Sequence, residues 1–443
     1  MTIINYFITL ISKNLKGLSW SNLPLFLFAF FISISNSISA IMIIFFFFSF
    51  VFCQNKYEKI KYVIKQPVNQ SILIFFTFIL ISFFWSDQIY FSQSIYKYSI
   101  LILIPFLDLL SFKKSDKKTA SFLFIIGLAF NIIYSFFISK LYQFGIFGKL
   151  FFLKGGHYEN DFFFRGFIDH SSLSLFIAFS IFIFLTYLFN AKKNKKKISL
   201  YFLIFMFVFF LLNSYGRTGF FTLILLLPVF VLIKKPRQLK VFLLFTIPFL
   251  CIAIIISQPF KTRIQKTFTF KKNFISNQEK IEKDAQYMSD SLGKSINYWV
   301  KKINTDPVWK NEVINKTPEN TIKNRYEIWK KYKIQIIQNP ILGMGAGGIE
   351  KILEEENFIN NRPHNSYILI ITEFGIVGLI LFLNIFYVQI KTFFREKKEK
   401  ILQIIFPLFF LTCMLINDYI IIYNTVCFFS LFSYLLYSVK NLD

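Results

Sequence analysis

Residues 41–52 read Ile-Met-Ile-Ile-Phe-Phe-Phe-Phe-Ser-Phe-Val-Phe, and runs of this kind decide the class of the protein. Apolar residues make up 55% of the 443 residues, and Phe alone contributes 64 of them. Charged residues are only 17%, against about 25% in an average soluble domain. Such runs would aggregate in water, so soluble enzymes, disordered chains and disulfide scaffolds are poor candidates. The sequence predicts an all-α polytopic membrane protein.

Apolar runs between charged clusters predict about 12 transmembrane helices. Several runs are shorter than the ~20 residues that a crossing needs, so their ends must include flanking polar residues. The break at Ser35-Asn36-Ser37 divides the first two spans. The predicted spans are 22–36, 38–53, 71–85, 95–110, 119–139, 167–189, 198–213, 218–233, 240–257, 365–388, 402–416 and 419–438.

The distribution of Lys and Arg predicts the orientation of these spans. If the N-terminus is cytoplasmic, the cytoplasmic segments hold 25 Lys and Arg residues and the short outer loops hold 6. Positive charge is retained on the cytoplasmic side of short loops, so both termini are expected to be cytoplasmic. The same clustering between apolar spans explains the net charge of +26 without nucleic acid.

One long segment interrupts the pattern between the ninth and tenth spans. Residues 258–364 hold the remaining 19 basic residues and 12 of the 24 acidic ones. Long loops translocate largely regardless of charge, so this segment is expected to be a folded periplasmic loop domain. The predicted organisation is therefore 1–257 with nine membrane helices, 258–364 as the loop domain, and 365–443 with three more helices.

Arginine and histidine residues mark the outer ends of several predicted spans. Arg165 and His170 lie at the start of the sixth span and Arg217 at the start of the eighth, after a short hairpin with Gly216. Helix N-termini with added arginines form binding sites for phosphate. The alternative is that these side chains only anchor the helix ends to lipid headgroups.

The loop domain contains one strong helix signal. Residues 321–338 are predicted to form an amphipathic helix that ends before Asn339-Pro340. Helical periodicity places Ile322, Tyr326, Trp329 and Ile336 on one face, with Arg325 at its rim. A helix that laid this face on the bilayer would direct Arg325 toward the headgroups. A snorkelling arginine is the alternative.

Two further patterns surround the start of the tenth span. Residues 343–348 match G-x-G-x-x-G, but no strand–turn–helix unit accompanies them, so we expect a flexible turn, or a backbone nest for phosphate, rather than a dinucleotide site. His364 begins the tenth span, where the helix dipole favours a neutral imidazole that suits a general base. His-x-x-x-His and Cys-x-x-Cys spacings are missing from the chain, so neither a metal nor a disulfide is expected.

Several of these patterns together resemble the O-antigen ligase/polymerase superfamily. The matching motifs are Arg325-x-x-x-Trp329, Pro340-x-x-Gly343-x-Gly345, His364-Asn365-x-Tyr367 and Glu373-x-Gly375-x-x-Gly378. The hairpin Tyr215–Gly219, which carries Arg217, resembles the arginine-bearing hairpin that precedes the eighth span of that family. The motifs occur in the family's order, around the large loop that the family also has.

The resemblance implies a GT-C-like glycosyltransferase of the bacterial inner membrane, with its active site facing the periplasm. Its donor is a glycan on undecaprenyl diphosphate, its acceptor is lipid A–core or a similar glycan, and it needs no cofactor or metal. His364, Arg217 and Arg325 are then the candidate catalytic residues. The candidate substrate-binding residues are Arg165, His170, Trp329 and Asn365.

Three functions are compatible with these sequence patterns. An inverting ligase that takes part in lipopolysaccharide biosynthesis is the first, and a polymerase that joins repeat units is the second, because both share these motifs. The third is a transporter of the same lipid, which would more often show charged or broken helices at the membrane midplane. The predicted spans carry few charges, and this favours an enzyme. Asp169 is the alternative base if His364 does not serve.

Overall fold

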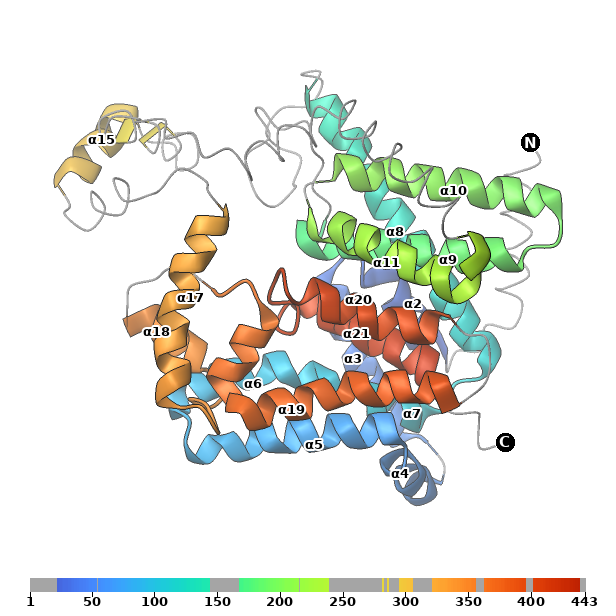
Figure 1. Cartoon of the computed structure of the whole chain (residues 1–443), viewed down its shortest axis with the longest axis horizontal. Helices are drawn as coiled ribbons and strands as arrows, with labels where there is room; N and C mark the ends of the chain where they lie inside the picture. The colour runs from blue at the N-terminus through green and yellow to red at the C-terminus, as the bar shows by residue number, and fades with distance from the viewer. Residues whose placement is uncertain are drawn as a thin grey trace.

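The computed structural model describes residues 22–53, 55–143, 167–214, 216–238, 281–282, 285–286, 295–305, 321–355, 362–395 and 401–438. The described residues fold as helices joined by turns, which confirms the all-α class for this part of the chain (Figure 1). The principal helices are α2 (Leu23–Phe31), α3 (Asn36–Val51), α4 (Lys56–Ile64), α5 (Pro67–Ile81), α6 (Gln88–Ser99), α7 (Leu103–Leu110), α8 (Lys114–Gln143), α9 (His170–Asn190), α10 (Asn194–Asn213), α11 (Thr218–Lys234), α15 (Ile296–Thr305), α17 (Thr321–Gln338), α18 (Gly348–Glu355), α19 (Ser366–Arg395), α20 (Leu402–Cys413) and α21 (Tyr423–Tyr437).

Wherever the chain is described, each predicted span contains a helix. Ser35 separates α2 from α3 and caps the latter by accepting the Ile38 N–H at 3.3 Å, as the predicted division requires. Among the described helices, six are long and apolar enough to cross a membrane: those over 67–84, 88–110, 114–138, 170–190, 194–213 and 366–395. The predicted span 240–257 lies outside the described residues. A total of twelve crossings therefore stays a prediction.

Helix α9 runs through the middle of the bundle. Within its apolar window 78% of the residues are buried, against 22% for its neighbour α10. Phenylalanines provide much of this packing: the Phe179 ring lies 5.3 Å from Phe406 and 5.5 Å from Phe428, and Phe176 lies 4.5 Å from Phe428. Aromatic pairs at such spacings are favourable beyond their buried area. They hold α9, α20 and α21 together, and the ends of these three helices carry the site described below.

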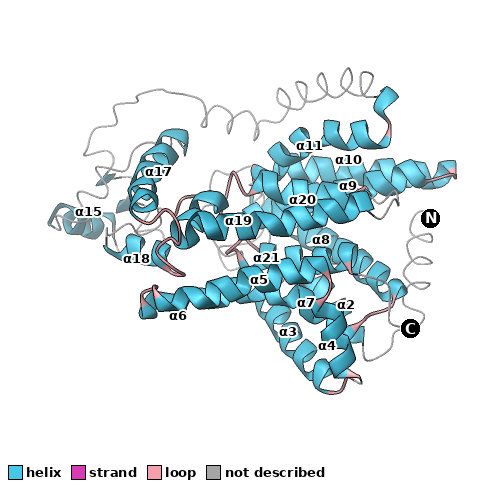
Figure 2. Ribbon diagram, turned by 60° about the horizontal axis from the view of Figure 1, so that its bottom comes forward, coloured by secondary structure: helices cyan, strands magenta, loops and turns pink. Residues whose placement is uncertain are grey.

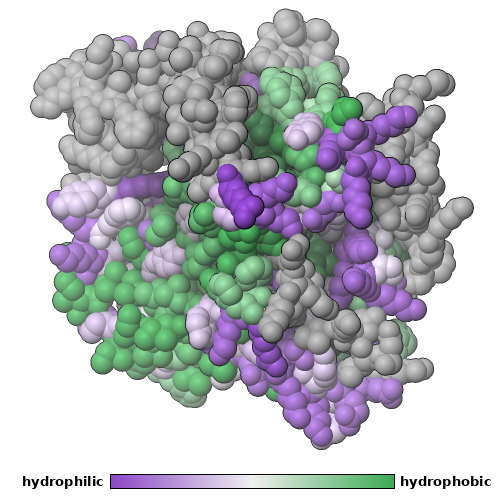
Figure 3. Space-filling view, turned by 45° about the vertical axis from the view of Figure 1, so that its right-hand side comes forward, coloured by the Kyte–Doolittle hydropathy of each residue, from purple (hydrophilic) through white to green (hydrophobic). Residues whose placement is uncertain are grey.

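The two ends of the bundle differ in composition. Helices α17 and α18 lie at one end and α4 lies at the other, as Figures 1 and 2 both show. The lysine-rich turn between α9 and α10, and the lysine-rich start of α8, lie away from α17, toward the α4 end (Figure 1). Figure 3 turns this end toward the viewer and shows hydrophilic side chains gathered beside an apolar flank. Exposed phenylalanines such as Phe47 and Phe205, at 63% and 64% exposure, suit such a flank to contact with lipid.

The glycine-rich turn at 343–348 joins the loop segment to the membrane helices. Helix α19 is kinked at Gly375, whose φ of +60° is accessible mainly to glycine. The kink frees the N–H groups of Ile376 and Val377, which donate to the carbonyls of Pro340 (2.9 Å) and Ile341 (3.3 Å). A Cβ on Gly343 would lie 2.4 Å from the Glu373 carbonyl carbon. The two glycine motifs therefore form one close backbone junction.

The N–H groups of this turn are used within the protein. Those of Met344 and Gly345 donate to the backbone carbonyls of Thr372 (3.0 Å) and Glu373 (2.7 Å). The Gly347 N–H donates to the Glu373 carboxylate at 3.2 Å, and the Ala346 N–H donates to the Ser82 hydroxyl at the same distance. The expected turn is present, but the prediction that it is flexible is wrong, because these N–H groups hold it to α19 and to Ser82, the residue after α5. The alternative of a phosphate nest is wrong for the same reason.

Reporter fusions would test the predicted orientation of the bundle. Fusions near Lys195 and Lys397 are expected to report the cytoplasm, and one near Glu319 the periplasm, because 25 of the Lys and Arg residues would then lie on the cytoplasmic side and only 6 in short outer loops. Paired alkaline phosphatase and fluorescent protein fusions measure this. A cytoplasmic signal at Glu319 would place the α17 end of the bundle on the wrong side for periplasmic chemistry.

Candidate functional site

Arg217 is positioned by two glycines that allow α11 to start against α9. A Cβ on Gly216 would lie 2.3 Å from the Ser174 hydroxyl and 2.4 Å from the His170 carbonyl oxygen. A Cβ on Gly219 would lie 2.0 Å from the Ser174 carbonyl oxygen. Arg217 is the residue that precedes α11, between these two contacts. Close approach of the two helix N-termini, more than turn formation, therefore explains the glycines of this hairpin.

Helix α17 has the predicted bounds, but its contacts differ from the prediction. The Trp329 indole Nε1 donates to the Pro363 carbonyl at 2.7 Å, and Tyr332 on the same face is buried. Tyr326, which was expected beside Trp329, is 56% exposed. The expectation that this aromatic face lies on the bilayer is wrong, because Trp329 and Tyr332 pack against the protein. Helical spacing places Arg325 with Trp329 and Tyr332, on the face toward the bundle.

Arg325 and Arg217 lie close enough to repel one another. Burial lowers the pKa of Arg325 from its ordinary value, the Asp418 carboxylate opposes this change, and the charge on Arg217 lowers that pKa further. The Arg325 Nε is buried and has no hydrogen-bond partner among the described residues. The Asp418 carboxylate offsets part of this positive charge, and the planar guanidinium groups can contact phosphate oxygens at two points. The pair is therefore suited to bind a phosphate or diphosphate.

His364 occupies an unusual turn just before α19. Its φ is +48°, a left-handed conformation that is uncommon for residues other than glycine. The Asp418 carboxylate holds the turn by accepting the N–H groups of His364 (3.0 Å) and Asn365 (2.7 Å). Burial raises the pKa of Asp418, while His364 and these two N–H groups act in the opposite direction. The turn between α20 and α21 thus fixes the backbone of His364.

Asn365 serves as the cap of α19. Its side-chain oxygen accepts the N–H groups of Tyr367 (2.9 Å) and Ile368 (3.2 Å), and its amide donates to the Leu415 carbonyl at 3.2 Å. These bonds satisfy orphan donors at the start of the helix. The predicted substrate-binding role of Asn365 stays a prediction. The cap already uses both the oxygen and the amide group of its side chain.

The start of α9 forms the opposite wall of the site. Asp169 caps the helix by accepting the N–H groups of Ser171 (3.0 Å) and Ser172 (3.1 Å), and its other oxygen lies 3.4 Å from Nδ1 of His170. The Asn417 amide donates to the Ser171 hydroxyl at 3.2 Å, which joins this wall to the α20–α21 turn. His170 is therefore near the predicted site, whereas Arg165 lies outside the described residues, as does His157, the third histidine of the chain.

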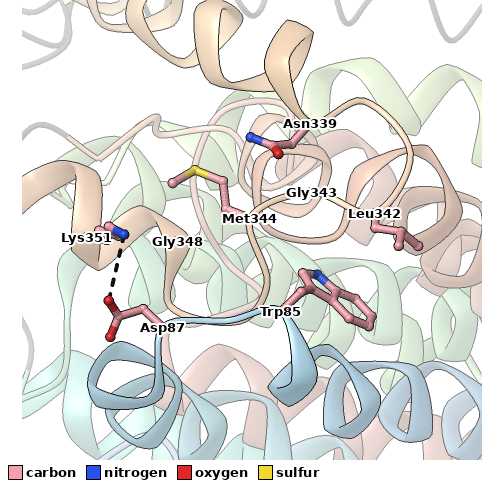
Figure 4. A pocket seen from close by; sticks show the side chains of 8 residues that line it. All are labelled: Trp85, Asp87, Asn339, Leu342, Gly343, Met344, Gly348 and Lys351. Carbon is pink, nitrogen blue, oxygen red and sulfur yellow. Dashed lines mark ion pairs between the residues drawn. The ribbon is translucent and has the colours of Figure 1, made fainter.

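A pocket of about 390 Å³ lies beside the glycine-rich turn, away from these residues (Figure 4). Lys351 and Asp87 point toward one another there, and their charged atoms are 3.7 Å apart. The pocket does not include any predicted site residue; its lining is Trp85, Asp87, Asn339, Leu342, Gly343, Met344, Gly348 and Lys351. Within the described part of the chain, no group of three or more His, Cys, Asp or Glu side chains could hold a metal ion.

A match to a protein-family model includes several of the residues described above. Residues 201–383, which include Arg217, Arg325, Trp329 and His364, match the family described as O-antigen ligase. The resemblance to the O-antigen ligase/polymerase superfamily is confirmed. No curated protein matches the chain. The O-antigen ligase match begins inside α10 and ends inside α19, so it includes the hairpin, the long loop segment and the kinked helix, but not the α20–α21 turn.

That turn is the part of the site that sequence reasoning missed. Neither Asn417 nor Asp418 belongs to a motif that the sequence singles out. A polar Asn-Asp pair between two apolar helices is typical of an ordinary turn. The Asp418 side chain is buried, at 3% exposure, and a buried carboxylate indicates that it bonds to other parts of the protein. This burial is visible only in the folded chain.

Proposed function

We propose that the protein is a ligase-type glycosyltransferase of the bacterial inner membrane. It would move a glycan from undecaprenyl diphosphate to lipid A–core or a similar acceptor at the periplasmic face. The observation that carries the proposal is the proximity of two arginines from distant elements, Arg217 and Arg325, at the bundle end that also holds the His364 turn. The family match supports lipid-linked glycan chemistry in a membrane.

The residues divide the reaction between them. The arginines bind the donor diphosphate, and bidentate contacts from their planar groups stabilise the charge that grows on the leaving oxygen. His364 accepts the proton of an acceptor hydroxyl as that oxygen attacks the anomeric carbon. The bond from this carbon to the diphosphate oxygen breaks, and undecaprenyl diphosphate leaves with the bonding electrons. One displacement from the opposite side inverts the anomeric configuration.

Each remaining candidate has a place in this scheme. Trp329 holds α17 to the chain beside His364 and so sets the position of Arg325. His170 and Arg165 would extend the cationic wall toward the donor.

The proposed reaction needs no metal or nucleotide, because the two arginines supply the positive charge that a metal would otherwise bring. Transfer by the purified protein in excess chelator should therefore proceed at the untreated rate, and a loss restored by a divalent ion would contradict this.

A deletion strain distinguishes the proposed ligase from a polymerase, which would use the same donor chemistry. Loss of the ligase removes all glycan from the lipid A–core, since no step remains to attach it. Loss of a polymerase leaves single repeat units attached to the core. The envelope glycolipids of the deletion strain, separated on gels beside the complemented strain, give the answer. An unchanged glycolipid profile would contradict both, and would favour a role outside this pathway, such as transport.

A further inference from the structure

A chain of hydrogen bonds connects the His364 ring to the N-terminus of α9. Nδ1 of His364 lies 3.2 Å from Oδ1 of Asn417. The amide Nδ2 of Asn417 lies 3.2 Å from the Ser171 hydroxyl, and that hydroxyl lies 2.5 Å from Oδ2 of Asp169. The chain joins three elements that are far apart in sequence, since Ser171 and Asn417 are separated by 246 residues.

The direction of each bond follows from the Asp169 end. A carboxylate only accepts, and Asp169 already accepts two backbone N–H groups at the start of α9, so the Ser171 hydroxyl must donate to it. Having given up its one hydrogen, the Ser171 oxygen accepts from its other neighbour, which must be the NH₂ group of Asn417. This orientation turns the Asn417 carbonyl oxygen toward His364, and an oxygen at that position requires a hydrogen on Nδ1.

We propose that Asn417 is a positioning residue that holds His364 as the Nδ1–H tautomer and so leaves Nε2 as the basic nitrogen. The proposal deepens the proposed function, on which it rests, by naming which ring nitrogen takes the acceptor proton and what keeps it free. When Nε2 accepts that proton, the ring becomes an imidazolium, and its bond to the Asn417 oxygen becomes charge-assisted and stronger. Asn417 thus also stabilises the charge formed during the reaction.

The backbone contacts of the same turn make the arrangement rigid. Asn417 accepts the Ser366 hydroxyl at its backbone carbonyl, 2.9 Å away, and the neighbouring Asp418 holds the His364 backbone. Ring and backbone of His364 are therefore fixed by adjacent residues of one turn. Without the Asn417 side chain the backbone contacts would persist, but the ring could rotate and either nitrogen could carry the hydrogen.

Nitrogen NMR measures the tautomer directly. The chain has only three histidines, so protein labelled with ¹⁵N-histidine in nanodiscs gives few signals, and the His364→Ala spectrum identifies those of His364. In alkaline buffer the parent protein should show a protonated Nδ1 and an unprotonated Nε2. Asn417→Ala should give a mixture of tautomers, while Asn417→Asp, which keeps an acceptor for Nδ1–H, should retain the parent pattern. A protonated Nε2 in the parent protein would overturn the proposal.

Kinetics provide the second measurement. Asn417→Ala should lower kcat for transfer by about 10- to 100-fold, the usual effect of removing a residue that orients an active group, with little change in KM for the donor. Ser171→Ala should lower kcat less, because Asn417 can still face His364 after losing its anchor. The matched control is Asn190→Ala, an exposed asparagine at the far end of α9, which should transfer at the parent rate. A parent-like kcat in Asn417→Ala would overturn the proposal.

The two proposals fail in different ways. If His364→Ala transferred glycan at the parent rate, the proposed function of His364 would be wrong, whereas the tautomer found by NMR would stand. If Asn417→Ala altered donor KM but neither kcat nor the tautomer, Asn417 would have only a structural role, and the proposed function would be untouched.

Discussion

Replacing His364 with alanine should slow glycan transfer by about 10²–10⁴-fold while leaving donor binding nearly intact, as expected for loss of a general base. The side chain sits on a strained turn whose backbone is held by Asp418, and Nδ1 faces Asn417. Because these contacts fix the turn through its backbone, alanine should preserve the surrounding structure. The measurement is donor-lipid binding and transfer by the purified variant in nanodiscs, with expression matched to the parent.

His157→Ala is the control for this variant, since it makes the same change in a histidine that no motif supports. It should transfer at close to the parent rate. Parent-like transfer by His364→Ala would exclude His364 as the base, and Asp169 would become the better candidate. Asp169 lies at the N-terminus of α9, close to the same turn through Ser171 and Asn417.

Arg325→Ala and Arg217→Ala should each weaken donor binding and slow transfer by about 10²–10³-fold, the effect of removing one preorganised donor from a developing negative charge. Lysine at either position should rescue only in part, because an ammonium group lacks the planar fork that contacts phosphate at two points. Arg237→Ala is the matched control, because Arg237 is an exposed arginine in the short turn that follows α11 at its other end. Parent-like binding in either site variant would remove that arginine from the donor site.

Thermal unfolding adds a readout that a structural role would not produce. Burial lowers the pKa of Arg325, the Asp418 carboxylate opposes this only in part, and Arg217 lowers that pKa further, so the charge of Arg325 is unfavourable on balance when no donor is bound. Arg325→Ala should therefore unfold at the parent temperature or above it in the absence of donor. Donor lipid should raise the unfolding temperature of the parent but not of the variant, since only a bound ligand shifts the equilibrium. Destabilisation without donor would indicate that Arg325 instead supports the fold.

Much of the helical framework could be predicted from local sequence. Long apolar runs identify helices because burying or lipid-facing apolar side chains is favourable wherever the run lies. The C-terminal end of α17 was predictable because Pro340 cannot continue a helix and disfavours helical conformation at Asn339. Arg217 and His364 could be selected because arginine and histidine are rare at the predicted outer ends of the apolar spans, and Arg325 because it lies on the predicted amphipathic helix in the Arg-x-x-x-Trp motif. These inferences need only properties of neighbouring residues.

The packing of α17 could not be obtained in this way. Periodicity grouped Tyr326 with Trp329, yet Tyr326 is exposed and Tyr332 is buried instead. An amphipathic pattern shows that one side of a helix avoids water, but it does not distinguish lipid from protein as the partner. In the same way, the glycine pattern at 343–348 was compatible with a nest until the contacts with the kinked α19 showed where its N–H groups donate.

Local sequence is enough to predict the apolar helices, the C-terminal end of α17 and the arginines and histidines that are candidates for chemistry. Packing of distant segments is needed to bring Arg217 near Arg325, and to let the Asn417-Asp418 turn hold His364 by its ring and its backbone. The two kinds of information differ because the forces involved differ in range along the chain. Helix formation depends on residues a few positions apart, whereas a hydrogen bond between Ser171 and Asn417 exists only after packing has brought together helix ends that are 246 residues apart.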